Sequence, residues 1–236
     1  MNRGRAVKRI ILVLSVLACG VALGDEVSKQ PKAPGIESED YIWNEMKGEK
    51  LKALKAKGDI LRGEISYEIC AGCHEFGAQG RVDGSFPRLA GQHATVLIKQ
   101  MTDVRAGRRD NPKMYPFAEK HVISPQDIAD ISLYLESLPV TPDNGHGPGL
   151  NLEMGKKLYE QDCVDCHGNH GEGSSAKFYP RVSGQHYLYL LREAFAIRDG
   201  ERRNANPDMV KVIKPYNADE IRAVCDYMSR FPVSRQ

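Results

Sequence analysis

The sequence lacks an excess of charge of either sign. Its 236 residues include 33 Lys and Arg and 31 Asp and Glu, and four of the basic residues lie among the first 24, which hold no acidic residue. Without those 24 residues the chain has 29 basic and 31 acidic side chains, a net charge of −2. Binding to nucleic acids calls for a basic surface, so we expect no nucleic-acid partner.

The sequence also lacks an apolar run long enough to span a membrane. Its one marked run, Ile10 to Leu17, is shorter than the roughly 20 residues that a spanning helix needs. The run follows basic residues and precedes Ala22-Leu23-Gly24, which is typical of a cleaved secretory signal. We therefore predict a signal peptide over residues 1–24 and a secreted protein. Alternatively, Val16-Leu17-Ala18-Cys19 resembles a lipobox, and a lipid on Cys19 would then tether the protein to a membrane.

Cysteine is scarce outside two pentapeptides, Cys70-Ala71-Gly72-Cys73-His74 and Cys163-Val164-Asp165-Cys166-His167. Two thiols on one helical turn can add to the two vinyl groups of one haem, and the following histidine can ligate its iron. A zinc site would need a second Cys or His pair, and a redox dithiol does not need the histidine. The motifs therefore predict two covalently attached haem c groups. The remaining Cys225 lies on an apolar helical face, and we expect a buried, unreactive thiol.

The two motifs belong to an internal duplication with a spacing of 93 residues. Residues 86–93, Phe-Pro-Arg-Leu-Ala-Gly-Gln-His, return as residues 179–186, Tyr-Pro-Arg-Val-Ser-Gly-Gln-His. Each copy also has a Gly and a Tyr four residues apart on a helix before the motif, where the glycine would allow close helix packing, and a helix start at Ser124 or Asn217. We predict an all-α fold of two tandem domains, residues 58–139 and 150–236, joined by a partly stiff, Pro-rich linker at 140–149.

Residues 25–57 have no counterpart in the second copy. Residues 25–40 contain Pro31, Pro34 and many charges, which predicts a flexible lead-in. Residues 41–57 have apolar side chains spaced among Lys and Glu, which predicts an amphipathic helix packed on the first domain. A helix that docks on a partner or a membrane surface is the alternative.

A haem with one histidine ligand needs a sixth ligand or keeps an open position for a substrate. Met114 and Met209 lie in matching Asn-Pro-x-Met loops, and no other methionines occupy matched loop positions. A thioether ligand favours ferrous iron and raises the reduction potential, which suits electron transfer. His93 and His186 are also matched and compete as ligands, although a capping or surface role fits them as easily. We favour methionine.

The order of motifs, repeated twice, resembles the dihaem cytochrome c4 family over roughly residues 58–232. The resemblance implies two class I cytochrome c domains related by a pseudo-twofold axis, with iron ligands His74 and Met114 in one, His167 and Met209 in the other. It implies that the carbonyls of Pro87 and Pro180 accept hydrogen bonds from the Nδ1–H groups of these histidines. It also suggests that Arg88 and Arg181 pair with haem propionates; solvated arginines are the alternative.

The same resemblance implies a periplasmic electron carrier rather than an enzyme, with redox proteins such as a terminal oxidase or a periplasmic dehydrogenase as partners. A dedicated electron-accepting subunit of a periplasmic oxidoreductase is the second hypothesis, with membrane association through that partner or through lipidation. A dihaem peroxidase is the third, and it would need one haem with a displaceable sixth ligand. The two matched methionines argue against it.

Overall fold

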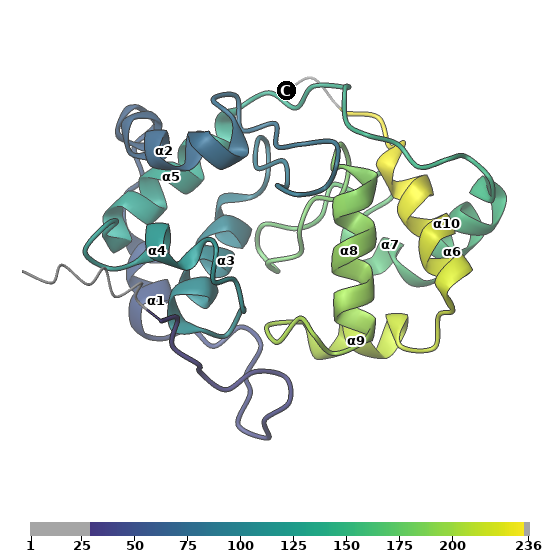
Figure 1. The fold of residues 1–236 in the computed structure, drawn as a ribbon, viewed down its shortest axis with the longest axis horizontal. Coiled ribbons are helices and arrows are strands. Elements are labelled where there is room, and N and C mark those ends of the chain that lie inside the picture. Colours follow the sequence, from purple (N-terminus) through teal and green to yellow (C-terminus); the bar gives the residue numbers. More distant parts are fainter. Residues whose placement is uncertain (1–28, 234–236) are drawn as a thin grey trace, which may run out of the picture.

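The structure is a computed structural model that describes residues 29–233. Within this range all regular elements are helices, apart from one isolated bridge between Ser174 and Tyr179. Figure 1 shows two helical sets side by side. The first set comprises α1 (Gly48–Lys55), α2 (Ile60–His74), α3 (Ala94–Ala106), α4 (Tyr115–Ala118) and α5 (Pro125–Ser137). The second comprises α6 (Leu152–Asp162), α7 (Val164–His167), α8 (Tyr187–Arg198), α9 (Pro207–Ile213) and α10 (Ala218–Ser229).

Each domain is built on a close crossing of its motif-bearing helix with its last helix. A Cβ atom added to Gly63 of α2 would lie 2.1 Å from the carbonyl oxygen of Asp130 in α5, and one added to Gly155 of α6 would lie 2.2 Å from that of Ala223 in α10. Only glycine permits these approaches, so the predicted close packing is confirmed in both copies. Beside each crossing two tyrosine rings pack together, Tyr67 on Tyr134 and Tyr159 on Tyr227.

The last helix of each domain begins at the predicted residue. Ser124 accepts a hydrogen bond from the backbone N–H of Asp127, and the Asp127 carboxylate accepts one from Ser124 N–H. Asn217 and Glu220 form the same capping box on α10. Such caps each stabilise a helix by about 1 kcal/mol, because they satisfy N–H groups that have no partner within the helix.

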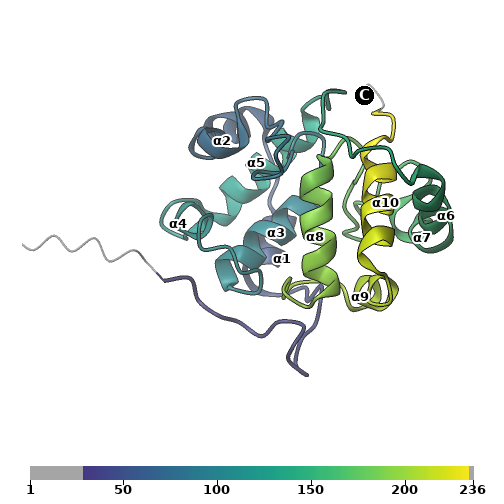
Figure 2. The same ribbon diagram turned by 45° about the vertical axis from the view of Figure 1, so that its right-hand side comes forward.

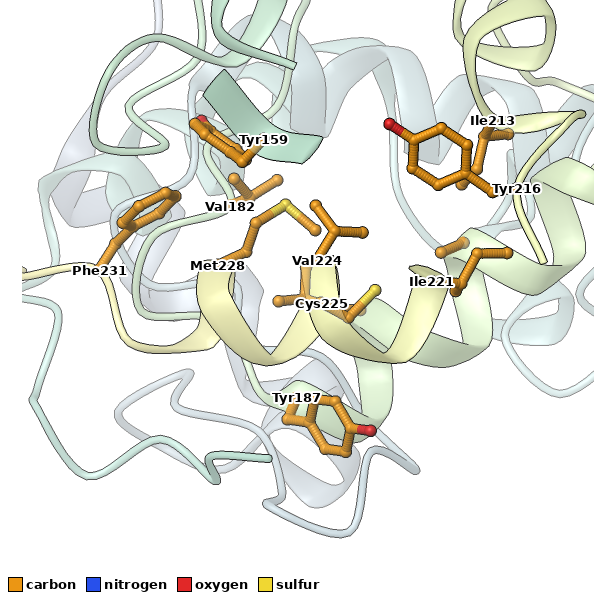
Figure 3. Close-up of a cluster of buried hydrophobic side chains, with 12 residues drawn as sticks. Tyr159, Val182, Tyr187, Ile213, Tyr216, Ile221, Val224, Cys225, Met228 and Phe231 are labelled. Atoms are coloured by element: carbon orange, nitrogen blue, oxygen red, sulfur yellow. The ribbon is translucent and has the colours of Figure 1, made fainter. Parts of the chain in front are cut away.

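The buried core of the second domain surrounds α10. Figure 3 shows Cys225 among Val224, Ile221 and Tyr187, and its side chain is fully buried. Burial raises the pKa of the Cys225 thiol well above its ordinary value. The expected burial of Cys225 is therefore confirmed, and the raised pKa disfavours the reactive thiolate. No helix in residues 29–233 is long and apolar enough to cross a membrane, and the predicted signal peptide and Cys19 lie outside the described residues.

The N-terminal extension differs from both expectations. Residues 29–40 do not run free of the domains: the backbone N–H of Ile36 donates to the carbonyl oxygen of Arg203 at 2.7 Å. The helix spans only Gly48–Lys55. Residues 41–47 are not helical, and Trp43 contacts both domains: its ring stacks on Tyr179 of the second with centroids 6.0 Å apart, and Nζ of Lys99 in the first lies 5.3 Å from its centroid. Helix α1 does lie on the first domain, with Glu49 bonded to Arg105 at 2.7 Å. Tertiary contacts outweighed the helical periodicity.

Candidate haem sites

The first site is built at the C-terminal end of α2, which carries Cys70, Cys73 and His74. His74 is buried, and its Nδ1 atom lies 3.1 Å from the carbonyl oxygen of Pro87. A carbonyl can only accept, so this contact places the proton on Nδ1 and leaves the Nε2 lone pair for a metal. Burial also lowers the pKa of His74, an effect that outweighs the hydrogen bond to Pro87. The ring is thus held neutral, as an iron ligand must be.

The second site repeats this geometry on a different local backbone. Cys163 is the fourth residue after Tyr159, whereas Cys70 is the third residue after Tyr67. The helix accordingly stops at Asp162, and the motif occupies the separate turn α7. Even so, Nδ1 of His167 lies 3.1 Å from the carbonyl oxygen of Pro180, and burial lowers the pKa of His167. The histidine environment is therefore kept although the helix leading to it is not.

Two further matched glycines leave room for the close approach of the proline carbonyls. Gly80 and Gly173 each lie six residues after the motif histidine, and both have positive φ, +68° and +69°. A Cβ on Gly80 would lie 2.5 Å from the carbonyl oxygen of Pro87, and one on Gly173 2.6 Å from that of Pro180. The internal repeat contained this signal, since the two glycines are also 93 residues apart.

Arg88 and Arg181 meet the requirements for propionate partners. Arg88 is 4% exposed, so the solvated alternative is wrong for this residue. Its guanidinium donates to the carbonyl oxygens of Thr141 and Gly184 and pairs with Asp143. The Nε–H groups of Arg88 and Arg181 are both buried without a protein partner, the two such side-chain atoms in residues 29–233. An unsatisfied buried donor costs about 1–3 kcal/mol, and a propionate carboxylate beside each one would remove that cost.

The two candidate methionines lie in different settings. Met114 precedes α4, and its backbone N–H donates to the Asn111 side chain at 3.1 Å. Met209 is the third residue of α9 and packs against the core of the second domain. Both are half-buried. Met101 lies on α3 and packs against the core of the first domain, and Met228 lies on α10 in the core of the second.

The competing ligands His93 and His186 lie at the boundary between the domains. Nε2 of His93 is 2.8 Å from the carbonyl oxygen of Glu172, and Nε2 of His186 is 2.7 Å from that of Gln79. Nδ1 of His186 accepts from the N–H of Gly145 at 3.4 Å. Coordination by either histidine would break a contact between domains. In this structure both histidines therefore join the two domains.

The adjacent glutamines form a reciprocal pair of bonds across the same boundary. The Gln185 side chain accepts from the backbone N–H of Arg88 and donates to its carbonyl oxygen, each at 2.9 Å. Gln92 makes the same two bonds with the backbone of Arg181, again at 2.9 Å. Corresponding residues of the two domains therefore contact each other, as at the interface of a twofold-symmetric dimer. The glutamine and histidine of each Gly-Gln-His repeat thus make contacts between the domains. The glutamine bonds also join the loop that carries Arg88 to the loop that carries Arg181.

The comparisons with known proteins agree with this architecture. The family model of cytochrome c matches the chain twice, at residues 60–139 and 152–231, and the chain belongs to this family. The tandem arrangement places it more narrowly in the dihaem cytochrome c4 family, whose members carry electrons through two covalently bound haem c groups.

Individual relatives support this assignment. Cytochrome c4 of Azotobacter vinelandii is 31% identical over 193 residues, covering 73% of this chain and 89% of that protein. A thiosulfate dehydrogenase electron acceptor from Stutzerimonas stutzeri (strain A1501) is 34% identical over 171 residues, covering 68% and 77%. The crystal structure of reduced cytochrome c4 from Pseudomonas stutzeri superimposes with a TM-score of 0.67 at 26% identity, covering 75% of this chain and all of that one.

A thiosulfate dehydrogenase from Marichromatium purpuratum also superimposes, with a TM-score of 0.65 at 30% identity. It covers 74% of this chain, which in turn spans only 41% of the dehydrogenase chain.

The family match and the cytochrome c4 structure confirm the predicted all-α fold of two tandem cytochrome c domains and the predicted pair of haems.

Proposed function

We propose that this protein is a periplasmic one-electron relay between redox proteins, with no substrate of its own. His74 and Met114 ligate one iron, and His167 and Met209 the other. The observation that carries the proposal is the duplicated site, in which a buried histidine is oriented by a proline carbonyl at 3.1 Å in both domains. A haem iron whose two axial positions are both filled by protein ligands has no open position for a substrate, which favours electron transfer over catalysis.

The haems would supply the redox change, and the contacts between the two domains would hold both haem sites in a fixed relation. The reciprocal glutamine bonds join the Arg88 and Arg181 loops directly. Because each loop also presents a buried Nε–H for a propionate, the frame orients both haems relative to the same interface. Little reorganisation on electron transfer is the expected consequence.

The visible spectrum of the oxidised, haem-loaded protein tests this ligation. Two low-spin haems with the methionine–iron charge-transfer band are expected. Met114→Ala and Met209→Ala should each remove half of that band while covalent haem is retained. One stable high-spin haem that turns over peroxide would instead establish the peroxidase alternative.

A dedicated electron acceptor of a dehydrogenase is the second candidate, favoured by two similar proteins whose names refer to thiosulfate dehydrogenase. Catalytic amounts of a thiosulfate dehydrogenase plus thiosulfate would then reduce both haems rapidly, and the two proteins would copurify at high salt. Slow reduction, and equally fast reduction by unrelated donors, would favour the general carrier.

We also propose secretion, with cleavage before Asp25. The signal-like run of residues 1–24 supports it. The mass of the mature protein tests the cleavage site directly. A product that begins at a diacylglycerol-modified Cys19 would establish the lipid anchor instead.

A further inference from the structure

Residues 30–41, here called the strap, cross from the first domain to the second. The strap is the purple segment along the lower edge of Figures 1 and 2, and it has no counterpart in the second repeat. It begins against the C-terminal end of α3, where the Gln30 amide donates to the carbonyl oxygens of Val104 and Arg109 at 2.7 and 2.8 Å. It ends at Tyr41, whose hydroxyl donates to the carbonyl oxygen of Ala205 at 3.0 Å.

At its first end the strap holds the loop that carries Met114. The Gln30 side-chain oxygen accepts from the backbone N–H of Asn111 at 2.9 Å. The Asn111 side chain in turn accepts from the backbone N–H of Met114 at 3.1 Å, and its amide nitrogen lies 3.9 Å from the Met114 sulfur. Gln30 thus makes three hydrogen bonds, and one of them reaches the methionine through a single intervening residue.

At its second end the strap holds the segment that leads into Met209. The Arg203 carbonyl accepts from Ile36, and the Arg203 guanidinium bonds Glu37 and the carbonyl oxygen of Ala33. Arg203 also donates to the carbonyl oxygen of Gly107 in the first domain at 2.8 Å.

The segment held in this way leads directly into α9. Ala205, which accepts from Tyr41, is followed by Asn206, the residue that caps α9. The Asn206 side chain accepts from the N–H of Asp208, the neighbour of Met209.

We infer that the strap is a clamp on both methionine ligands, with Gln30 as the positioning residue for Met114 and Tyr41 for Met209. The inference rests on the methionine ligation proposed above. Release of a methionine from ferric iron requires its loop to move away, and each hydrogen bond that fixes the loop opposes that movement. Loss of one bond of ordinary strength changes such an equilibrium roughly 2- to 12-fold.

Imidazole binding to the ferric, haem-loaded protein measures this equilibrium, because imidazole enters only where methionine leaves. Gln30→Ala should raise the imidazole affinity of the first haem about tenfold and leave the second unchanged. Tyr41→Phe should raise that of the second haem roughly 2- to 12-fold and leave the first unchanged. The NMR signals of the two bound methionine methyl groups, assigned with Met114→Ala and Met209→Ala, show at which haem imidazole has replaced methionine.

Glu39→Ala is the matched control, since this exposed side chain lies on the strap between the two contacts. It should leave both affinities as in the unsubstituted protein. Unchanged imidazole binding in Gln30→Ala, or equal changes at both haems in Gln30→Ala and Tyr41→Phe, would overturn the clamp while leaving methionine ligation intact. Absence of the methionine–iron band from the unsubstituted protein would overturn the ligation and the clamp together.

Discussion

The residue after each motif histidine has a backbone conformation that suits glycine, but only the second copy has glycine there. Glu75 has φ 68° and ψ 158°, and Gly168 has φ 79° and ψ 172°. Tyrosine hydroxyls hold both peptides, that of Tyr67 on the Glu75 carbonyl at 2.8 Å and that of Tyr159 on the Gly168 carbonyl at 2.7 Å. The first copy therefore carries backbone strain that the second avoids.

Glu75→Gly should consequently stabilise the first domain. Strain in this region costs about 1–3 kcal/mol for a residue other than glycine, and the greater freedom of glycine in the unfolded chain offsets about 0.4–1 kcal/mol of it. Glu75 is exposed, so its removal gives up no buried contact. The expected net gain is about 1 kcal/mol. Gly168→Ala should produce a larger loss, because it creates the strain that Glu75 already bears and also places a Cβ atom 2.2 Å from the Glu172 carboxyl carbon.

Thermal unfolding of the haem-loaded variants measures both effects. A change of 1 kcal/mol shifts the midpoint by about 2–4 °C in a protein of this size. Glu68→Gly is the control: this exposed residue lies inside α2, where glycine should cost about 1 kcal/mol. If Glu75→Gly lowers the midpoint as Glu68→Gly does, the reasoning from strain is refuted.

Three further predictions concern the frame around the haems. Gly80→Ala should push the Pro87 carbonyl away from His74, which makes this iron ligand less basic. A redox titration should then show a raised reduction potential at the first haem alone, and an unchanged potential would contradict this prediction. Gln185→Ala should destabilise the protein by about 1–3 kcal/mol in urea unfolding, because it leaves the backbone N–H and carbonyl of Arg88 unpaired in a buried interface. Burial alone would raise the pKa of Asp130, but hydrogen bonds led by that from Arg62 lower it overall. The ionised Asp130 therefore stabilises the protein above about pH 4, and this contribution is lost as the pH falls further. Asp130→Asn should reduce the change in the free energy of unfolding between about pH 4 and lower pH, measured by urea unfolding at each pH.

The local features of each domain could be predicted from the sequence. Gly63 and Gly155 are matched in the two copies, and a glycine four residues before an aromatic on a helix already indicates a close crossing. Ser124 and Asn217 carry their capping signals within three residues. The haem motifs encode their chemistry within five residues. These features depend on neighbours in the chain, and the duplication supplied an independent second instance of each.

The features that depend on contacts between domains could not be predicted in this way. Gln92 and His93 match Gln185 and His186, but nothing in the spacing shows that their partners lie in the other copy. Trp43 lies within the range 41–57, where the apolar spacing predicts a helix, whereas in the structure it lies in a turn before α1 and stacks on Tyr179. Such contacts join residues 79 or more positions apart, and a single sequence does not report them.

A redox titration of the haem-loaded protein, followed by its visible spectrum, tests whether both haems act as closed one-electron sites. We expect two one-electron steps, with both haems low-spin in each state and the methionine–iron band lost in proportion to reduction. A single step of one haem, or a haem that stays high-spin when oxidised, would contradict the two-site relay.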